Sequence, residues 1–525
     1  MNDFISCEYQ LTCDASEVDA QARDLALEQT VEVPEALITD PAIRDGVVGR
    51  VEGIDRDAFG KGAHRVKVGY HAWLANGQIP QLLNLLFGNI SIKGNIRLTA
   101  VTLPKPMLNR FRGPRFGLEG VRALLGVYGR PLLATAIKPR GLNNAGLAKI
   151  AGDFVRGGGD IVKDDHNLAD DDYAAFCKRV LACHEAAVAA NEATGRNGQY
   201  FPSLMAPSTE LERYAEYLIK IGIKGVLVSP ALIGYDAVRH LSETYPLVYM
   251  AHPAFSGSYY ANRAHGIAPE VLLGTLFRLM GCDMSVFPNY GGRFGLTREE
   301  CVGIQSALQC PMGNHAPGWP APAGGMSFER LPSMAEAYGV DSVFLVGGAL
   351  LSHGDDLAAS TREYLDVINR DFSEDLRAPM REWTSSCEIL SQSTLNLLHH
   401  LRITGDLEWE GRPATVYKAD ESLPFAGVKR VELVGKAGEA SDFELRYFEL
   451  EPGGYTSLER HVHSHTVIGV RGEGMVVRNN EKAALKVNEI AYIGPLEPHQ
   501  LRNESAAPFG FYCIVDRERD RPMEV

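Results

Sequence analysis

Lysine, acidic and histidine side chains stand directly at the ends of short apolar runs in the middle of the chain. Lys138 follows one such run, Lys163 and Asp165 end the next, and His252 ends another. A lysine placed beside other cations can have its pKa lowered enough to act as a base. This set of side chains is therefore suited to proton transfer.

A second group of candidate ligands lies near the C-terminus, where His461, His463 and His465 alternate with other residues and His499 follows later. Alternate residues of a strand face the same side, so the first three imidazoles are predicted to point inward from one strand. Four imidazoles suit a transition metal such as Mn2+ better than Mg2+. The alternative is a histidine cluster with a purely structural role.

Eight apolar runs, separated by amphipathic stretches, must position the first group. This alternation is typical of parallel strands linked by helices, and eight repeats predict a closed (β/α)8 TIM barrel in an α/β fold. Residues 144–156, 210–221 and 269–280 have apolar residues at helical spacing. The predicted strands span residues 132–139, 160–165, 199–206, 225–230, 247–253, 284–289, 319–325 and 342–350.

Polar residues and glycines collect at the carboxyl ends of these runs, where barrels place their active sites. Glycine pairs let backbone amides approach phosphate oxygens closely. Besides the lysines, Asp165 and His252, the candidates there are Asn289, Gly324, Gly325, Gly347 and Gly348.

The chain is predicted to contain three regions, because 525 residues exceed what one hydrophobic core holds. Residues 1–125 form an α+β domain, and residues 126–403 form the barrel with C-terminal helices over 355–400, including a leucine-rich stretch at 390–401. Residues 404–525 form an all-β domain, because short alternating segments are punctuated there by Gly and Pro. Its predicted strands are 443–450, 466–470, 474–477, 489–493 and 509–515.

The bulk composition excludes several classes of protein. Apolar content of 45% and charged content of 22% are ordinary for a globular chain. The net charge of −14 argues against a nucleic-acid partner. No signal-peptide pattern and no apolar run of about 18 residues is present, so no membrane association is expected. Nine cysteines without CxxC pairs predict reduced thiols and a cytoplasmic location.

Residues 158–167, with the sequence GGDIVKDDHN, resemble the GGxDFxKDDEN signature of the RuBisCO superfamily. In that family the lysine is carbamylated and joins the following acids around Mg2+. The resemblance thus implies metal-ligand roles for Lys163, Asp165 and His166, with Mg2+ or another divalent ion. His166 replaces the family's glutamate, and its nitrogen favours softer ions. A salt bridge at the barrel mouth is the alternative role for Lys163 and Asp165.

Further motifs extend this resemblance over roughly residues 5–400. Residues 135–142 (TAIKPRGL) resemble the family's (T)IKPxxGL, whose lysine, here Lys138, transfers protons, and His252 matches an active-site histidine. The glycine pairs 324–325 and 347–348 match pairs that bind phosphate. Residues 87–89 (FGN) resemble a segment whose asparagine reaches the metal site of the neighbouring subunit. The resemblance therefore implies a homodimer with an active site shared through Asn89.

Two departures from the family concern the reaction. Carboxylases carry His-Arg after the fifth strand and a mobile lysine after the sixth, whereas this sequence has His252-Pro253 and, at 287–293, FPNYGGR. CO2 fixation is not expected without that lysine. The sequence is identified as a RuBisCO-like protein, a group that keeps enolisation chemistry on other sugar phosphates.

The C-terminal region resembles a cupin, a small jelly-roll barrel in which HxH and a later histidine bind Mn, Fe, Ni or Zn. The resemblance rests on residues 452–454 (PGG), the four histidines, residues 472–474 (GEG) and residues 494–503 (GPLEPHQLRN). Val467 and Ile468 occupy the place of the usual first-motif glutamate, so His465 is predicted to substitute for it. Cys513, on the last apolar strand, is either inert core filling or a nucleophilic thiol inside the cupin.

The fusion favours one branch of the RuBisCO-like proteins. The hypothesis is isomerisation of 5-methylthioribulose 1-phosphate to 1-methylthioxylulose 5-phosphate through an enediolate, with Lys138 and either Lys163 or His252 moving protons. The cupin would then remove methanethiol, with Cys513 accepting the methylthio sulfur. Two alternatives remain: a decarboxylase, hydrolase or enolase acting on another sugar phosphate or sugar-acid phosphate, and a cupin that only senses or dimerises.

Overall fold

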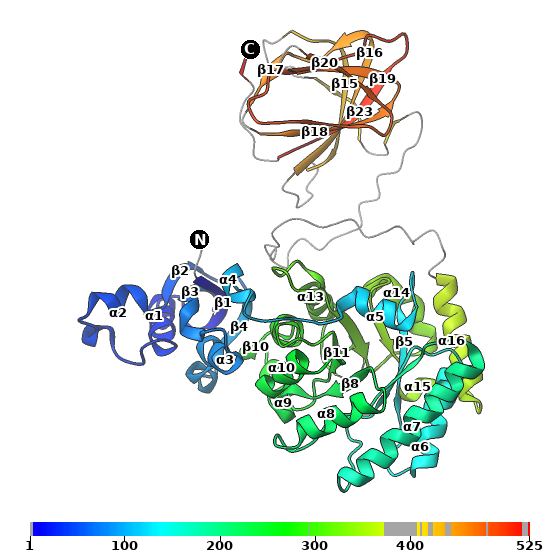
Figure 1. Cartoon of the computed structure of the whole chain (residues 1–525). Coiled ribbons are helices and arrows are strands. Elements are labelled where there is room, and N and C mark those ends of the chain that lie inside the picture. The colour runs from blue at the N-terminus through cyan, green and yellow to red at the C-terminus, as the bar shows by residue number, and fades with distance from the viewer. Residues whose placement is uncertain are drawn as a thin grey trace. The chain divides into compact units, whose positions relative to one another are not determined.

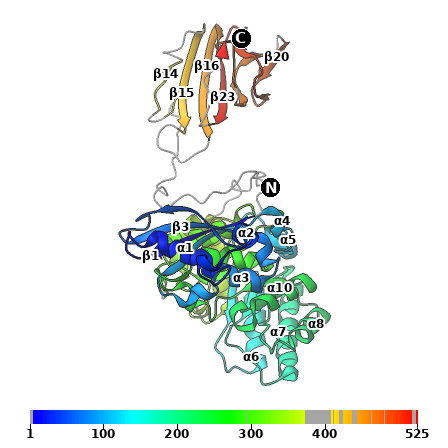
Figure 2. The same ribbon diagram turned by 90° about the vertical axis from the view of Figure 1, so that its left-hand side faces the viewer.

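The chain forms two compact units, Met1–Cys387 and Glu388–Val525 (Figures 1 and 2). The computed structural model describes residues 4–292, 294–371, 407–409, 412–417, 424–435, 443–461, 463–478, 481–516 and 523–524. The predicted leucine-rich stretch at 390–401 and the predicted boundary at 403–404 lie outside these residues. Among the described residues no helix combines the length and the apolar character needed to cross a membrane.

An N-terminal sheet opens the first unit, with the strand order β10-β4-β1-β3-β2. In β1, Ile5, Cys7, Tyr9 and Leu11 are buried while the residues between them are not, as expected for a strand covered on one face. The last strand added, β10, comes from far along the chain and pairs in parallel with β4. The strands are β1 (Phe4–Thr12), β2 (Arg50–Asp55), β3 (Ala63–His71), β4 (Ile96–Thr102) and β10 (Gly266–Ile267).

Eight parallel strands follow, in the order β7-β6-β5-β13-β12-β11-β9-β8. The two outer strands meet through a bridge between Ser203 and Leu227, so the sheet forms a nearly closed barrel. All eight predicted strands are confirmed. They are β5 (Leu132–Ile137), β6 (Ile161–Asp164), β7 (Gln199–Phe201), β8 (Gly225–Val228), β9 (Val248–Ala251), β11 (Met284–Pro288), β12 (Trp319–Ala323) and β13 (Val343–Leu345).

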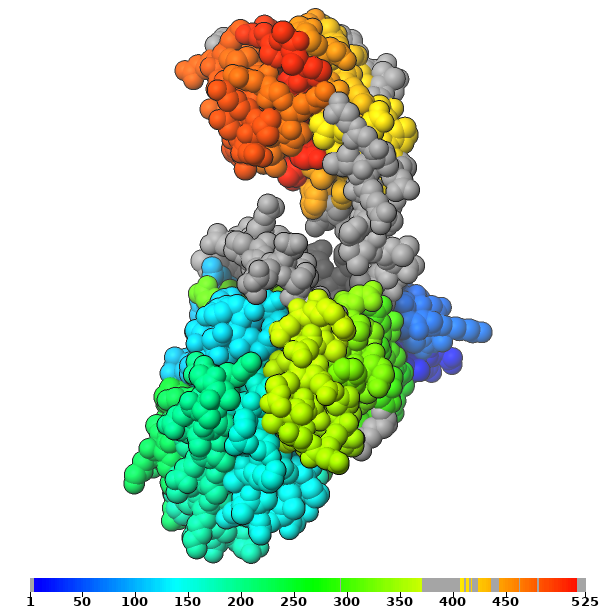
Figure 3. Space-filling view, turned by 90° about the vertical axis from the view of Figure 1, so that its right-hand side faces the viewer, coloured from blue at the N-terminus to red at the C-terminus, as the bar shows by residue number. Residues whose placement is uncertain are grey.

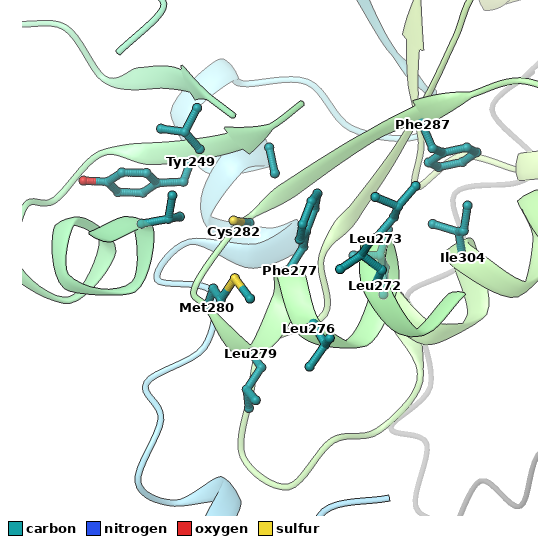
Figure 4. Packing of buried hydrophobic residues seen from close by; sticks show 14 of the residues in the cluster. Tyr249, Leu272, Leu273, Leu276, Phe277, Leu279, Met280, Cys282, Phe287 and Ile304 are labelled. Atoms are coloured by element: carbon teal, nitrogen blue, oxygen red, sulfur yellow. The ribbon is translucent and has the colours of Figure 1, made fainter. Parts of the chain in front are cut away.

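Helices cover the outside of the barrel strands. The predicted segment 269–280 consists of the π-helical segment η4 (Glu270–Leu276) followed by α12 (Phe277–Leu279). Its residues Leu272, Leu276 and Phe277 are buried in the core that also holds Tyr249 of β9 and Phe287 of β11 (Figure 4). Figure 3 shows the face on which α16, in yellow-green, lies beside α6. The predicted helices 144–156 and 210–221 are confirmed as α6 and α8.

The barrel helices are α5 (Gly117–Leu125), α6 (Asn144–Arg156), α7 (Tyr173–Thr194), α8 (Leu211–Lys220), α9 (Pro230–Ile233), α10 (Tyr235–Thr244), α11 (Gly257–Tyr260), α13 (Arg298–Gln309), η5 (Phe328–Arg330), α14 (Leu331–Tyr338), α15 (Gly348–Leu351) and α16 (Leu357–Asp371). Those before the barrel are α1 (Val18–Glu28), η1 (Glu35–Leu37), α2 (Pro41–Gly46), η2 (Ala72–Ala75), α3 (Ile79–Phe87), η3 (Asn89–Ile92) and α4 (Lys105–Leu108).

The second unit is an antiparallel all-β barrel, as predicted. Its interior is lined by apolar side chains such as Phe448, Val467, Phe509 and Phe511. Its strands are β14 (Thr415–Val416), β15 (Ala426–Val434), β16 (Phe443–Tyr455), β17 (Glu459–Arg460), β18 (His465–Arg471), β19 (Glu473–Arg478), β20 (Glu481–Lys486), β21 (Ile490–Ile493), β22 (His499–Arg502), β23 (Phe509–Asp516) and β24 (Met523–Glu524).

Candidate functional sites in the two barrels

The carboxyl ends of β5, β6 and β9 bring five of the predicted residues together. Lys138 Nζ lies 2.5 Å from Asp165 Oδ2, and His166 Nδ1 lies 3.5 Å from Asp165 Oδ1. The ring of His166 stacks on that of His252, with 4.2 Å between ring centroids. Lys163 is 2% exposed beneath them. The sequence-predicted proton-transfer residues therefore form one cluster.

Lys163 has an unusual environment within this cluster. Burial, opposed by the charge of Asp165 and assisted by the nearby charge of Lys138, lowers the pKa of Lys163 from 10.5 to about 8. Its Nζ donates a hydrogen bond to the Asp164 carbonyl oxygen at 3.0 Å. An amine with a pKa close to the working pH can take up and release protons readily.

Asp165 is the anion of the cluster. Although burial acts in the opposite direction, the hydrogen bond from Lys138 and that from the Asn167 N–H lower the pKa of Asp165 to about 2. Asp165 therefore stays ionised at neutral pH and holds Lys138 at the mouth.

His252 is held as a neutral imidazole. Burial and the charge of Lys163 place the pKa of His252 well below its ordinary value. The Ala254 N–H donates to Nδ1 of His252 at 3.1 Å, so the neutral ring carries its proton on Nε2. His252 can thus donate a hydrogen bond to a substrate oxygen from Nε2.

The barrel cluster fits a Mg2+ ion poorly as it stands. Hard divalent ions need several oxygen ligands, whereas Asp165 is paired with one ammonium group and lies beside another. Carbamylation of Lys163 would be needed to add a second carboxylate, so the predicted metal roles of Lys163, Asp165 and His166 stay predictions.

The buried carboxylate of Asp164 anchors this region from the opposite face of β6. It is 0% exposed and accepts hydrogen bonds from Arg179 (2.6 Å), the Tyr200 hydroxyl (2.7 Å) and the Ser203 N–H (2.8 Å). Because successive residues of a strand point to opposite faces, this network fixes Lys163 and Asp165 toward the mouth. The two adjacent aspartates thus have different roles.

The glycine pairs lie at the ends of β12 and β13. Gly324 and Gly325 have φ values of 77° and 70°, which disfavour other residues. A Cβ on Gly325 would lie 2.7 Å from Gly292 Cα, so the loops after β11 and β12 approach too closely for alanine. Gly347, next to Gly348 of α15, lies near Lys138, since a Cβ there would be 4.0 Å from Lys138 Cε.

Asn289 does not point into the mouth, in contrast to the prediction. Its Nδ2 lies 2.9 Å from the sulfur of Met334 and its Oδ1 accepts a hydrogen bond from Tyr338 at 2.7 Å. Both partners belong to α14, so the amide is buried between the barrel and that helix. Its placement does not support the predicted contact with substrate.

Asn89 lies outside the barrel cluster of its own chain. It is exposed at the start of η3, and its Nδ2 donates to Glu28 at 3.0 Å and to Glu32. A role for Asn89 at the active site would therefore require a second subunit.

The four predicted histidines of the cupin gather in its interior. His461, His463, His465 and His499 are all at most 9% exposed, and His461 stacks on His463 and His465 at centroid distances of 3.8 and 4.3 Å. The prediction that one strand carries the first three is wrong. Only His465 lies in β18, while His461 and His463 belong to neither β17 nor β18, and the three rings contact one another.

The tautomers of two histidines suit metal binding. Nδ1 of His461 bonds to the carbonyl oxygen of His463 at 2.8 Å, and Nδ1 of His499 bonds to that of Glu497 at 2.9 Å. Each Nδ1 therefore carries the proton, which leaves the Nε2 lone pair for a metal. Burial and neighbouring histidines lower the pKa of His461 to about 4. The buried Nε2 atoms of His461 and His465 have no hydrogen-bond partner among the described residues.

Glu459 is a candidate ligand that the sequence analysis missed. It is 7% exposed, and its carboxylate lies with nitrogen atoms of His461 and His499 in a group whose atoms are all within 4.8 Å of one another. Ser457 Oγ donates to Glu459 at 2.8 Å and so orients the carboxylate. The sequence signal for this ligand is that Glu459 stands two residues before His461. The donors form two such groups, one of His461, His463 and His465 and the other of Glu459, His461 and His499, and their nitrogen and carboxylate donors suit a transition-metal ion.

Replacing Glu459 by Gln is expected to lower the affinity of the cupin for Mn2+ by about 10- to 100-fold, because a carboxylate ligand loses its charge. Titration of metal-free full-length protein with Mn2+, followed by elemental analysis after gel filtration, measures this change. Glu451→Gln, on an exposed part of β16, is the matched control. Unchanged Mn2+ binding in Glu459→Gln would remove Glu459 from the ligand set.

Cys513 lies inside the cupin beside the histidines. Its Sγ is 3.7 Å from His465 Nδ1 and 3.6 Å from Nη2 of Arg446, its cross-strand neighbour on β16. Cys513 is 3% exposed and Arg446 is 8% exposed. A buried guanidinium stabilises a thiolate, so this arrangement suits a nucleophilic sulfur. Arg446 was also missed by the sequence analysis.

Comparisons with known proteins agree with this geometry. The model of the ribulose bisphosphate carboxylase large chain, catalytic domain, matches residues 117–290, and the cupin domain model matches residues 446–515. The chain is 36% identical over 370 residues to 5-methylthioribulose-1-phosphate isomerase of Rhodospirillum rubrum, covering 70% of this chain and 97% of that protein.

Two further similarities point the same way. The chain is 32% identical over 309 residues to 2,3-diketo-5-methylthiopentyl-1-phosphate enolase of Geobacillus thermodenitrificans, covering 58% of this chain and 74% of that one. The crystal structure of a RuBisCO-like protein from Rhodopseudomonas palustris shares 36% identity and a TM-score of 0.64, covering 73% of this chain and all of that one. The chain therefore belongs to the RuBisCO superfamily, as a RuBisCO-like protein that carries a C-terminal cupin domain.

Proposed function

We propose that this protein isomerises 5-methylthioribulose 1-phosphate to 1-methylthioxylulose 5-phosphate in its RuBisCO-like barrel and then releases methanethiol in its cupin. The observation that carries this proposal is the position of Cys513. Its sulfur lies between Arg446 and His465, and His465 belongs to a group of histidines that could hold a metal ion. A thiol in that position suits chemistry at the sulfur of the barrel's product. The similarity to an isomerase of the same substrate supports the first step.

The isomerisation moves the carbonyl group from C2 to C4 of the substrate through two enediolates. Each half requires a base to remove a proton from the carbon next to the carbonyl and an acid to return a proton to the former carbonyl carbon. Lys163, whose pKa is about 8, is the proposed base. Lys138 and the Nε2–H of His252 are the proposed partners of the enediolate oxygens.

The glycine pairs after β12 and β13 are the proposed phosphate site. Gly347 lies close to Lys138, so phosphate held there would place the carbons of the substrate near the lysines.

In the cupin, the Cys513 thiolate is proposed to attack the methylthio sulfur. The carbon–sulfur bond breaks, the electron pair remains on the sugar as an enolate, and a proton at C1 gives 1-deoxyxylulose 5-phosphate. Cys513 is left in a mixed disulfide with the methylthio group, and two equivalents of a small thiol reduce it to release methanethiol. A divalent metal held by Glu459 and the histidines would supply a Lewis acid for the sugar oxygens.

We also propose that the protein acts as a homodimer. Asn89 is exposed and lies apart from the barrel cluster of its own chain, so its proposed contact is with the barrel of a partner subunit.

A 31P and 1H NMR time course tests both steps in one sample. The purified full chain is incubated with 5-methylthioribulose 1-phosphate, a small thiol and Mn2+. A shift of the phosphate signal followed by a 1-deoxy methyl signal is the expected result. No spectral change would contradict the methylthio assignment and favour the alternative, an enolase or decarboxylase acting on a sulfur-free sugar phosphate or sugar-acid phosphate.

The isomerase activity is expected to rise with pH and level off above about pH 8, because burial lowers the pKa of Lys163 to about 8 and only the neutral amine accepts a proton. Initial rates of isomerisation between pH 6 and pH 9, in buffers free of CO2, measure this dependence. If the rate instead depends on added bicarbonate at constant pH, Lys163 acts as a carbamate and its proposed role as a base is wrong.

A further inference from the structure

The turn that follows His252 contains a phenylalanine in a position that ordinarily takes glycine. The Ser256 N–H donates to the Pro253 carbonyl oxygen at 3.0 Å, which closes a four-residue β-turn. Phe255, the third residue of this turn, has a φ of 67°. Left-handed backbone at the third turn position favours glycine, and it is strained for a bulky side chain. Backbone preference therefore does not explain the phenylalanine.

Packing against the described residues does not explain it either. The side chain of Phe255 is 72% exposed, whereas the next residue, Ser256, is 0% exposed and anchors the turn. A single exposed apolar side chain is ordinary, but strain and exposure together at one residue are not. Strained residues of this kind cluster at functional sites.

The turn lies at the mouth of the barrel. The Ala254 N–H, inside the turn, donates to His252 Nδ1, and the His252 ring stacks on His166 of the cluster. Phe255 is thus linked through Ala254 to His252, a proposed catalytic side chain. Residues 253–256 are Pro, Ala, Phe and Ser, so the turn brings no cation that would bind a second phosphate.

The neighbouring strand end has a similar character. β9 pairs with β11, and Phe294, in the loop after β11, is 54% exposed. The two loops meet where Arg263 Nη2 lies 3.5 Å from the Gly295 carbonyl oxygen. Exposed aromatic side chains therefore belong to the β9 and β11 loops, and the glycine pairs belong to the β12 and β13 loops.

We propose that Phe255 forms an apolar subsite for the thioether end of the substrate, opposite to the phosphate. A thioether sulfur gains favourable contact with an aromatic ring, and a flat exposed ring accepts a methyl group without a polar partner. This inference rests on the proposed function. Phe255 is the residue that would distinguish a methylthio group from a hydroxyl group at C5 of the sugar.

The test compares two ligands that differ only at C5. 5-Methylthioribulose 1-phosphate and ribulose 1-phosphate are titrated calorimetrically into the full chain carrying Lys163→Met, which is expected to slow turnover about 10³-fold, with Phe255 intact or replaced by Gly or Leu. Phe255→Gly is expected to weaken binding of the methylthio compound about tenfold and to leave ribulose 1-phosphate binding unchanged. Phe255→Leu should lie between, because it keeps apolar surface but loses the ring.

The controls separate this effect from misfolding and from assembly. Glycine suits the backbone at position 255, so the thermal midpoint of Phe255→Gly should not fall. Tyr128→Gly, an exposed aromatic residue 59% accessible before the start of β5, should leave both affinities unchanged. An equal loss for both ligands, or no loss for either, would overturn the subsite. The subsite would also be overturned if Phe255→Gly changed the molecular mass of the protein in solution but not the ratio of the two ligand affinities. Phe255 would then contact a second subunit.

The two proposals fail separately. If the unmodified chain does not isomerise the methylthio substrate but the affinity ratio still depends on Phe255, the subsite stands and the proposed function falls. If isomerisation occurs and the ratio is independent of Phe255, the proposed function stands and the subsite falls.

Discussion

Cys513→Ser is expected to reduce methanethiol release by at least about 10³-fold, because a hydroxyl cannot form the mixed disulfide. Isomerisation in the barrel should continue at the unmodified rate, so 1-methylthioxylulose 5-phosphate should accumulate. Phosphorus NMR measures the accumulating product, and a thiol-reactive reagent measures the methanethiol that collects in the headspace.

Cys13→Ser is the matched control, because Cys13 is a half-buried free thiol of the first unit. It should leave both activities unchanged. Methanethiol release at the unmodified rate from Cys513→Ser would show that Cys513 is only core filling, and the position of Arg446 beside it would then need another explanation.

Lys163→Met is expected to lower the isomerisation rate by about 10³-fold, because it removes the proposed base while keeping the length of the side chain. Rates measured by phosphorus NMR on the full chain give this change. Lys149→Met on α6, whose side chain is 77% exposed, is the control and should be fully active. Activity within a few-fold of the unmodified chain would leave Lys163 with only a structural role at the mouth.

The same substitution should stabilise the fold at neutral pH. The pKa of Lys163 falls on folding from 10.5 to about 8, so its buried charge opposes folding by about 3 kcal/mol below pH 8. The unfolded chain binds more protons between these two values, so stability of the unmodified protein should rise with pH from about 8 to about 10.5. Urea unfolding of Lys163→Met should lack this rise. A methionine variant that is less stable at pH 7 would favour the salt-bridge alternative.

The barrel strands could be predicted from sequence because each is buried on both faces and appears as a continuous apolar run. The residues after them could be assigned to one mouth because parallel strands share a carboxyl end. The direction of a side chain at a strand end could not be predicted in the same way. Asn289 follows β11 as Lys138 follows β5, yet its amide contacts Met334 and Tyr338 of α14. Successive residues of a strand face opposite sides, so the place directly after a strand does not fix the direction of the side chain.

The cupin site shows a second limit of sequence reasoning. His461, His463 and His465 were predicted as ligands from their types, and they do gather, but only His465 belongs to a strand, β18. Arg446 reaches Cys513 because β16 and β23 pair in a particular register, and residues 67 positions apart carry no local signal of that contact. Glu459 stands two residues before His461 and not at the usual glutamate position of the cupin motif, which Val467 and Ile468 occupy, so the motif does not predict it as a ligand.

The strand β10 connects the barrel to the sheet formed by the first 125 residues. β10 leaves the β9–β11 connection, the same connection that begins with His252 and Phe255, and joins the edge of the N-terminal sheet at Arg97 and Leu98. The connection is therefore held at its start by the barrel strand β9. Further along, β10 holds it to a sheet whose strand β4 lies more than 150 residues earlier in the sequence. The N-terminal region and the barrel therefore cannot be replaced independently of each other. A barrel inherited or expressed without its first 125 residues would keep every lysine and histidine of the mouth, yet its connection would have lost its far anchor.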